Sequence, residues 1–463
     1  LLGWLGQRTK AAAETGTPPT GPALAEDPVV AALVGEALAN RPELAQAKAT
    51  IQPELERVPP ASALPDPVVT MGIQNDGFSS IQLGEMETSW LVFMGSQTFP
   101  WAGKRDLQGE VIALGARRAE TDLQRVQLSI QAEVERAYID LLLARDQLRL
   151  LAKLESLWSQ AESMAQVRYE SGDGVQSDLL RAQLERSRLK QRRFLLEAEE
   201  RRRIAVLHRL RGRPAEEAID TSRSLADLPD PVLPDSTAVL ADAEVRSPEL
   251  QKSQLAIDQA AKQVDLAEKG SLPDLTVSAG VMPRGGDFET MWTAGVSFSI
   301  PIWSRSKQSA AVEANTIQGT AARYGAESTR QLLHQRMIER QTLLSALIET
   351  NRLYRAGLLV QSEATVASTT AQYQVGRITF ASVLEALTGY VADTAAFYES
   401  VAATQRVEIA QRELSLEPVA GVASAGMGGA PMPGAGAMSQ GSWSDAAATA
   451  SPAAARSGSM SGM

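Results

Sequence analysis

Residues 169–182, YESGDGVQSDLLRA, decide the fold together with their counterpart at 373–386, YQVGRITFASVLEA. Both segments hold Tyr, Gly, Leu and Ala at matching positions, namely Tyr169/Tyr373, Gly172/Gly376, Leu180/Leu384 and Ala182/Ala386. A Gly that ends one helix, followed by Ser or Thr ahead of a new apolar run, is typical of a turn between two helices. Because the pattern occurs twice, we predict two long helical hairpins built from one duplicated unit.

The segments that flank these turns have the periodicity of long helices. Between residues 101 and 169 apolar side chains recur in steps of three and four, which predicts a coiled-coil helix about 100 Å long. A return helix follows from Ser177 to about Arg211, and the second repeat has the same plan at 304–373 and 376–416. A compact core cannot bury such rods, so we expect them to pack lengthwise against one another.

Each long helix follows a pair of segments with strand-like alternation. In the first repeat these are residues 66–75 and 89–99, and in the second 275–282 and 291–300. A proline follows each second segment, Pro100 in the first repeat and Pro301 in the second. We therefore predict one strand pair in each repeat.

These patterns divide the chain into five parts. Residues 1–26, which begin without Met, look like the loose leader of a processed or truncated chain, and the Gly/Ala/Ser/Pro/Met-rich tail cannot bury enough surface to fold. The predicted parts are a leader 1–26, a first repeat 27–213 (strand pair 66–99, helical hairpin 102–211), a connector 214–235, a second repeat 236–416 (strand pair 274–300, hairpin 303–416) and a disordered tail 417–463.

Composition sets further limits. The chain has 463 residues, 44% of them apolar, a formal net charge of −10 and no cysteine. No stretch of about 18 uncharged apolar residues is present, so no transmembrane helix is expected. Short alternating strands are nevertheless compatible with a membrane.

Four strands in one chain are too few to enclose a lumen, and an open sheet in lipid leaves backbone groups unpaired. Three copies would supply twelve strands. The predicted fold class is therefore mainly α with a β part: an internally duplicated chain of long antiparallel coiled-coil hairpins plus four strands, trimerising into a 12-stranded β-barrel and an α-helical tunnel.

On these features residues 29–416 resemble the TolC-type outer-membrane efflux factors. The segment FPWAGKR at 99–105 and the RPEL and SPEL helix starts at 41–44 and 247–250 resemble the heavy-metal (cobalt-zinc-cadmium or copper-silver) branch. The resemblance implies a homotrimer in the outer membrane of a Gram-negative bacterium, with its tunnel in the periplasm. It also implies a periplasmic adaptor, an inner-membrane resistance-nodulation-division pump driven by protons, and a passive exit duct without enzymatic activity or cofactor.

The resemblance further implies a tunnel that closes at the hairpin tips. Position by position, the aperture residues carried over are Ser177, Asp178, Tyr373, Arg377 and Glu385, and the tips that contact the adaptor are Gly172, Asp173, Gly376 and Arg377. The family's arginine partner of the linking Tyr falls on Ile378, with Arg377 one residue away, and a second pore carboxylate falls on Ser382. Alternatively, Ser177 and Asp178 only cap the return helix and Glu385 lies on a solvated face.

Other candidate sites have simpler interpretations. The Arg-rich run 181–213 alternates with glutamates and contains one aromatic residue, so we expect a solvated helix face and no nucleic-acid binding. His208 and His334 lie on separate helices, and no cluster has metal-ligand spacing. The tail methionines Met427, Met432 and Met438 could bind Cu(I) or Ag(I) through their thioethers, but filler in a low-complexity tail is the favoured interpretation.

Two other classes of protein are alternatives to a channel. A periplasmic coiled-coil adaptor or soluble scaffold would also contain long hairpins, but an adaptor has one hairpin and extra barrel domains, whereas this chain has two hairpins and two strand pairs. The second alternative is an enzyme, but the sequence contains no candidate nucleophile or acid–base cluster that would support it. Detergent dependence and trimer formation would distinguish a channel from a scaffold.

Overall fold

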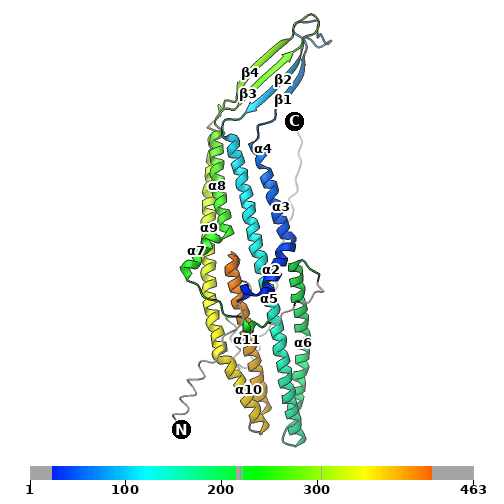
Figure 1. Ribbon diagram of the computed structural model, residues 1–463, viewed down its shortest axis with the longest axis vertical. Coiled ribbons are helices and arrows are strands. Elements are labelled where there is room, and N and C mark those ends of the chain that lie inside the picture. Colours follow the sequence, from blue (N-terminus) through cyan, green and yellow to red (C-terminus); the bar gives the residue numbers. More distant parts are fainter. Residues whose placement is uncertain (1–22, 215–218, 220–222, 304, 420–463) are drawn as a thin grey trace, which may run out of the picture. The chain divides into compact units, whose positions relative to one another are not determined.

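The computed structural model describes residues 23–214, 219, 223–303 and 305–419. These residues form the long helical hairpins and the four-stranded sheet that the sequence predicts, with the sheet beyond one end of the helices (Figure 1). The predicted mainly α fold with a β part is therefore confirmed for a single chain. The tail methionines and most of the leader lie outside the described residues.

The four strands pair antiparallel in sequence order. They are β1 (Val68–Gln74), β2 (Trp90–Phe99), β3 (Leu275–Met282) and β4 (Met291–Phe298). Each repeat contributes one hairpin, β1–β2 or β3–β4, as its alternating pattern predicts. The two hairpins join through β2 and β3, in a register that places Gly95 opposite Ala279. Strands far apart in sequence thus form the centre of the sheet, and β1 and β4 form its edges.

The first repeat begins with three short helices, α2 (Pro28–Asn40), α3 (Pro42–Glu56) and α4 (Val58–Ser62). Asp27 caps α2 by accepting a hydrogen bond from the Val29 amide at 2.9 Å. The long hairpin consists of α5 (Lys104–Glu170), which is about 100 Å long, and α6 (Gln176–Arg211). Contrary to the expected loose leader, a 3-10 helix, η1 (Leu24–Glu26), precedes α2, because Leu24 is buried in the core beside α5 and α6.

The second repeat has α7 (Ser236–Arg246), α8 (Pro248–Lys269), α9 (Gln308–Leu353), α10 (Leu359–Gln374) and α11 (Phe380–Glu413). The sequence predicts one long helix over 304–373, and the structure has helical conformation from Gln308 to Gln374, with a π-helical segment that was not predicted. A π-helix, η3 (Tyr354–Leu358), separates α9 from α10. Here Arg355 donates hydrogen bonds to the carboxylate of Asp230 and, at 3.2 Å, to the carbonyl of Leu228, so the interruption lies where the connector meets the helix.

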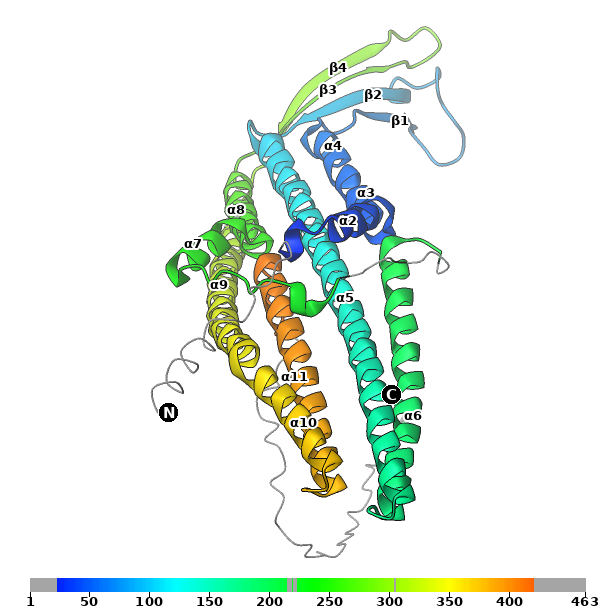
Figure 2. The ribbon, with the colours of Figure 1, turned by 60° about the horizontal axis from the view of Figure 1, so that its bottom comes forward.

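The connector holds the two repeats together. Its longest described part, residues 223–235, passes over α5 and α11 before α7 (Figure 2) and contains a short 3-10 helix, η2 (Leu225–Asp227). The buried Asp146 of α5 accepts hydrogen bonds from the Leu225 amide at 2.7 Å and from the Ser224 hydroxyl. Three consecutive residues further along, 228–230, all accept hydrogen bonds from side chains of η3, α9 or α11.

Two large apolar cores lie along the hairpins. One surrounds the middle of α5 and includes residues of α2, α6, η2 and α11. The other joins the lower parts of both hairpins, where Trp158 and Leu189 of the first meet Phe380 and Leu387 of the second. Both cores contain residues of α5 and α11, so this helix pair fixes one hairpin against the other. Within the described residues, no helix has the length and apolarity needed to cross a lipid bilayer.

Candidate functional site: the two-faced sheet and the hairpin tips

The sheet has one apolar face. Neighbouring residues of a strand point to opposite faces, and residues paired across strands share a face. The strand register therefore places on one face, called here the apolar face, Val69, Met71, Ile73, Leu91, Phe93, Gly95, Gln97, Phe99, Leu275, Val277, Ala279, Val281, Trp292, Ala294, Val296 and Phe298. Most of its large side chains are exposed, from 40% for Phe99 to 78% for Trp292, whereas Leu91 and Leu275 are half-buried.

The opposite face is rich in hydroxyl groups and glycine. This hydroxyl face carries Thr70, Gly72, Ser96, Thr98, Thr276, Ser278, Gly280, Thr293, Gly295 and Ser297, together with Gln74 and the apolar residues Val68, Trp90, Val92, Met94, Met282 and Met291. None of the four strands contains Asp, Glu, Lys or Arg. The sheet is therefore free of charged residues and has two chemically different faces.

The edges of the sheet are open. Within the described residues β1 pairs only with β2, and β4 only with β3. Unpaired backbone groups at an edge strand are a template for another strand, and proteins in water protect such edges with charges or covering elements. Here the edge strands β1 and β4 carry no charged residue.

At the far ends of the helices, the two hairpin tips lie in contact. Gly172 and Gly376 end α5 and α10 with positive φ angles of 82° and 72°, a conformation that glycine adopts without strain. Beside them Tyr373 is only 2% exposed, and its ring packs on Phe380 with centroids 5.5 Å apart. The tips therefore share part of an apolar core within one chain.

Arg168, near the end of α5, joins the two tips. Its guanidinium donates hydrogen bonds to the carbonyl of Tyr373 at 2.7 Å and to the carbonyl of Asp173 at 3.1 Å. It also lies over the Tyr373 ring, 4.9 Å from the centroid. A Cβ atom on Gly376 would lie 3.3 Å from the same guanidinium, so the glycine leaves room for this contact. Arg168 was not among the residues carried over by resemblance, although it directly precedes the Tyr of the first tip.

The carried-over residues divide into two groups. Asp178 and Tyr373 come close together: burial, and then the nearby Asp178 carboxylate, raise the pKa of the Tyr373 hydroxyl. Arg377 is instead exposed, and its side chain has no hydrogen bond or ion pair with any described residue. In this chain Tyr373 thus has an arginine partner from the first hairpin, Arg168, rather than from its own tip.

Ser177 and Asp178 do not cap α6 by hydrogen bonding. The helix begins after Val175, and no side chain accepts a hydrogen bond at that cap. The capping alternative is therefore wrong in that form. Asp178 lies in the first turn, where its charge is favourable for the helix dipole.

Glu385 is exposed and lines a groove between α10 and α11. Asp393 and the hydroxyl-bearing residues Ser362, Thr365 and Ser382 line the same groove. Its exposure is compatible with both alternatives, a pore-facing carboxylate and a solvated helix face.

Of the remaining candidates, His334 and the basic run have partners, whereas neither ring nitrogen of the buried His208 has a hydrogen-bond partner among the described residues. His208 is 1% exposed, and His334 lies 2.7 Å from Glu244. On α6, Arg186 pairs with Glu162 at 2.5 Å and Arg193 with Glu155 at 3.1 Å, which ties the basic run to α5. Among the described residues no group of three His, Cys, Asp or Glu could hold a metal ion.

Comparison with known proteins identifies chains of similar sequence and fold. Residues 239–416 match the family described as outer membrane efflux protein. The solved outer-membrane channel OprN is 18% identical with a TM-score of 0.70, over 88% of this chain and 96% of that one. CusC is 16% identical (TM-score 0.68, 84% of this chain and 92% of that one). The outer membrane protein VceC of Vibrio cholerae is 15% identical (TM-score 0.69, 83% and 95%).

No curated protein sequence matches the chain. At these identities the structural likeness establishes the fold, while the family match covers the second repeat alone. The chain therefore has the fold of these outer-membrane channels, and its second repeat is similar in sequence to the outer membrane efflux protein family.

Proposed function

We propose that this chain is the outer-membrane channel subunit of a tripartite efflux pump. The observation that carries the proposal is the charge-free sheet with one apolar face, one hydroxyl face and two open edges. In a bilayer the apolar face would contact the lipid tails, and the hydroxyl face would line a lumen. The fold shared with OprN, CusC and VceC supports the same conclusion.

Closure requires further copies of the chain. Strand β4 of one copy would pair antiparallel with β1 of the next, which satisfies both edges. Three copies would give twelve strands, enough to leave an aqueous channel, and the long hairpins would continue this channel as a periplasmic tunnel. The tunnel would receive substrate from an inner-membrane pump through a periplasmic adaptor that binds the tips around Gly172, Asp173, Gly376 and Arg377.

The tips would form the gate. The contact of Arg168 with Tyr373 and the approach of Asp178 hold the two hairpins of one chain together. Three copies of Glu385 around a narrow axis would repel anions and concentrate cations. Cation selectivity of the reconstituted pore should therefore fall in the Glu385→Ala protein and persist in the Glu399→Ala protein, in which a carboxylate further along the same helix is lost.

For the substrate we propose heavy-metal cations, on the basis of the resemblance at 99–105 and the acidic charge of the chain. A host strain that lacks the chain should become sensitive to zinc, cadmium, copper or silver salts. Sensitivity to organic drugs alone would instead assign the channel to drug efflux.

The closure of the sheet can be tested with cysteines, because the chain contains none. Thr70→Cys on β1 would be combined in turn with Thr293→Cys, Gly295→Cys and Ser297→Cys on β4, all on the hydroxyl face. We expect oxidation of at least one combination to produce cross-linked dimers and trimers and no larger species. Thr70→Cys with Met94→Cys is the matched control, because these residues are paired within one chain and should give a cross-linked monomer.

The alternative function is a periplasmic coiled-coil adaptor or scaffold. It predicts a protein that stays in solution without detergent and gives no cross-link between β1 and β4. That result, with the control pair oxidised normally, would overturn the channel proposal.

A further inference from the structure

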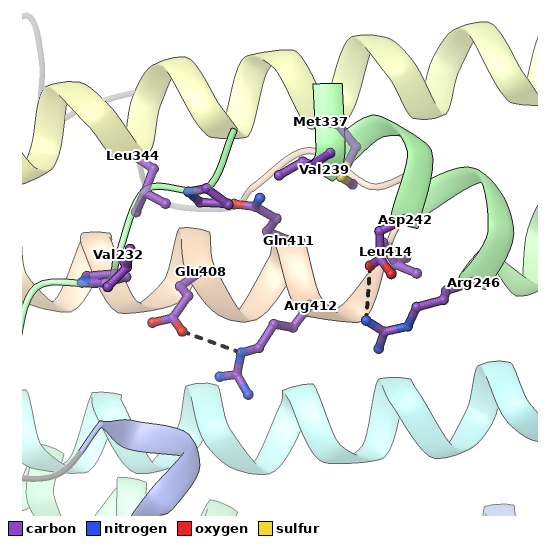
Figure 3. A pocket seen from close by; sticks show the side chains of 13 residues that line it. Val232, Val239, Asp242, Arg246, Met337, Leu344, Glu408, Gln411, Arg412 and Leu414 are labelled. Carbon is purple, nitrogen blue, oxygen red and sulfur yellow. Dashed lines mark hydrogen bonds and ion pairs between the residues drawn. The ribbon is translucent and has the colours of Figure 1, made fainter. Parts of the chain in front are cut away.

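A pocket of about 520 Å³ lies outside the tips and the sheet, between α7, α9, α11 and the connector (Figure 3). Its walls are mostly apolar. Met337 and Leu344 of α9 and Leu414 after α11 are buried residues that reach it from the core, and Val239 of α7 and Val232 of the connector complete it. The pocket has the size and lining of sites that bind small molecules.

Two polar side chains of α11 face this apolar space. Glu408 and Gln411 are three residues apart and so lie on one face of the helix. The carboxylate of Glu408 accepts no hydrogen bond from any described residue. Its nearest cation is Arg412, whose Nε atom is 3.7 Å away and makes no hydrogen bond.

Arg412 is already engaged by another carboxylate. Its two terminal nitrogens donate to Glu135 of α5 at 2.8 and 3.4 Å, and Glu135 is only 3% exposed. The guanidinium of Arg412 is thus shared between the carboxylates of Glu135 and Glu408. The other charged residues of the lining, Asp242 and Arg246, form their own ion pair at 3.0 Å and add no net charge. Among the described residues Glu408 is therefore left without a hydrogen-bond donor of its own, although the buried Arg340 of α9, which donates only to backbone carbonyls, balances the total charge around the pocket.

The carboxylate of Glu408 is poorly solvated. Burial, opposed by Arg412 and reinforced by the nearby Glu135 carboxylate, raises the pKa of Glu408 above its ordinary value. A desolvated carboxylate at an apolar wall is stabilised by a cation that donates a hydrogen bond to it. A neutral apolar ligand would leave the carboxylate without such a donor, and an anion would be repelled.

We propose that this pocket binds a small organic cation with a compact apolar body and a protonated amine. The amine would pair with Glu408 and reach the Gln411 amide oxygen, and the apolar body would contact Met337, Leu344 and Leu414. All these groups belong to one chain, so the inference goes beyond the proposed channel function and does not depend on it.

Calorimetric titration of the full-length protein with three ligands of one shape tests the proposal. The ligands are 1-adamantylamine, which is protonated at neutral pH, 1-adamantanol and adamantane-1-carboxylate. We expect the amine to bind about tenfold more tightly than the alcohol, and the carboxylate to bind least. Equal binding of amine and alcohol, or binding of none of the three, would overturn the proposal.

Variants assign the site. Glu408→Gln keeps the shape of the side chain and should lower amine affinity about tenfold, to that of the alcohol, while alcohol binding persists and shows that the pocket is intact. Glu399→Gln, on the same helix but outside the pocket, should change neither. Leu344→Trp should fill the pocket and abolish both. Undiminished amine binding by the Glu408→Gln protein would refute the assignment.

Discussion

Replacement of Arg168 by Gln tests whether this side chain holds the hairpin tips together. Arg168 makes two hydrogen bonds, to the carbonyls of Tyr373 and Asp173, and a cation–π contact with the Tyr373 ring. At this half-buried position the hydrogen bond to Tyr373 contributes about 1 kcal/mol and the ring contact about 0.5 kcal/mol, whereas the hydrogen bond to Asp173 lies within the first hairpin and does not join the tips. A loss of about 1.5 kcal/mol between the hairpins would shift the equilibrium between joined and separated tips roughly tenfold.

Two measurements report this shift. Spin labels on cysteines at Glu170 and Ala371, which are exposed near the ends of α5 and α10, report the distance between the hairpins within one chain. In the Arg168→Gln protein we expect longer and broader distances and a higher conductance of the reconstituted pore. Arg377→Gln is the matched control, because this arginine is exposed and has no partner among the described residues. Distances and conductance that are the same in the Arg168→Gln and wild-type proteins would refute the reasoning.

Three further predictions concern the sheet, the π-helix and the connector. Ala279→Arg places a charge on the apolar face, which would cost about 2–4 kcal/mol in lipid and should prevent membrane insertion. Ser278→Arg places the same charge on the hydroxyl face and should be tolerated. Outer-membrane fractionation measures how much of each protein reaches the membrane. Asp230→Ala removes an acceptor of Arg355 and should speed amide hydrogen exchange in η3 while leaving exchange in the sheet unchanged. Burial raises the pKa of Asp146, so the carboxyl group binds a proton more readily in the folded protein than in the unfolded chain. The free energy of unfolding should therefore fall as the pH rises from the ordinary pKa of 3.8 to the raised pKa of the folded protein. Asp146→Asn should remove this pH dependence, as measured by urea unfolding.

The helices and strands could be predicted because their signals are local. A period of 3.6 or 2 residues needs only a dozen neighbouring positions, and the glycine turns at 172 and 376 are short segments. The duplication added information, since each repeat supported the interpretation of the other. The pairing of β2 with β3 was not predicted, because it joins strands from different repeats.

The π-helix escaped prediction for a physical reason. Residues 354–358 have an ordinary helical composition, and their conformation is accompanied by contacts of Arg355 with Asp230 and Leu228 in the connector. Nothing near residue 355 in the sequence indicates where those partners will lie. Glu408 escaped for a similar reason, since its surroundings come from four separate segments.

The tip residues show both the use and the limit of resemblance. Resemblance selected Tyr373, and the structure places it at the contact between the tips. It placed the arginine partner at Ile378, one residue from Arg377, whereas the guanidinium over the Tyr373 ring belongs to Arg168. A position-by-position transfer assigns the partner by its offset along one segment, but a cation can reach the same ring from the neighbouring hairpin. The side chain that fills the role is therefore found only when both hairpins are placed.

The duplication itself explains why the sheet is incomplete. Two copies of a strand pair, joined through β2 and β3, leave the first strand of one repeat and the last strand of the other at opposite edges. These edges run antiparallel and differ in sequence, so one edge of a chain can pair with the other edge of its neighbour but need not pair with itself. Such head-to-tail contacts generate a ring when the rotation between copies closes and an open filament when it does not. In the proposed channel, closure into a ring would satisfy every backbone group of the sheet, whereas a filament would always leave two edges exposed to lipid.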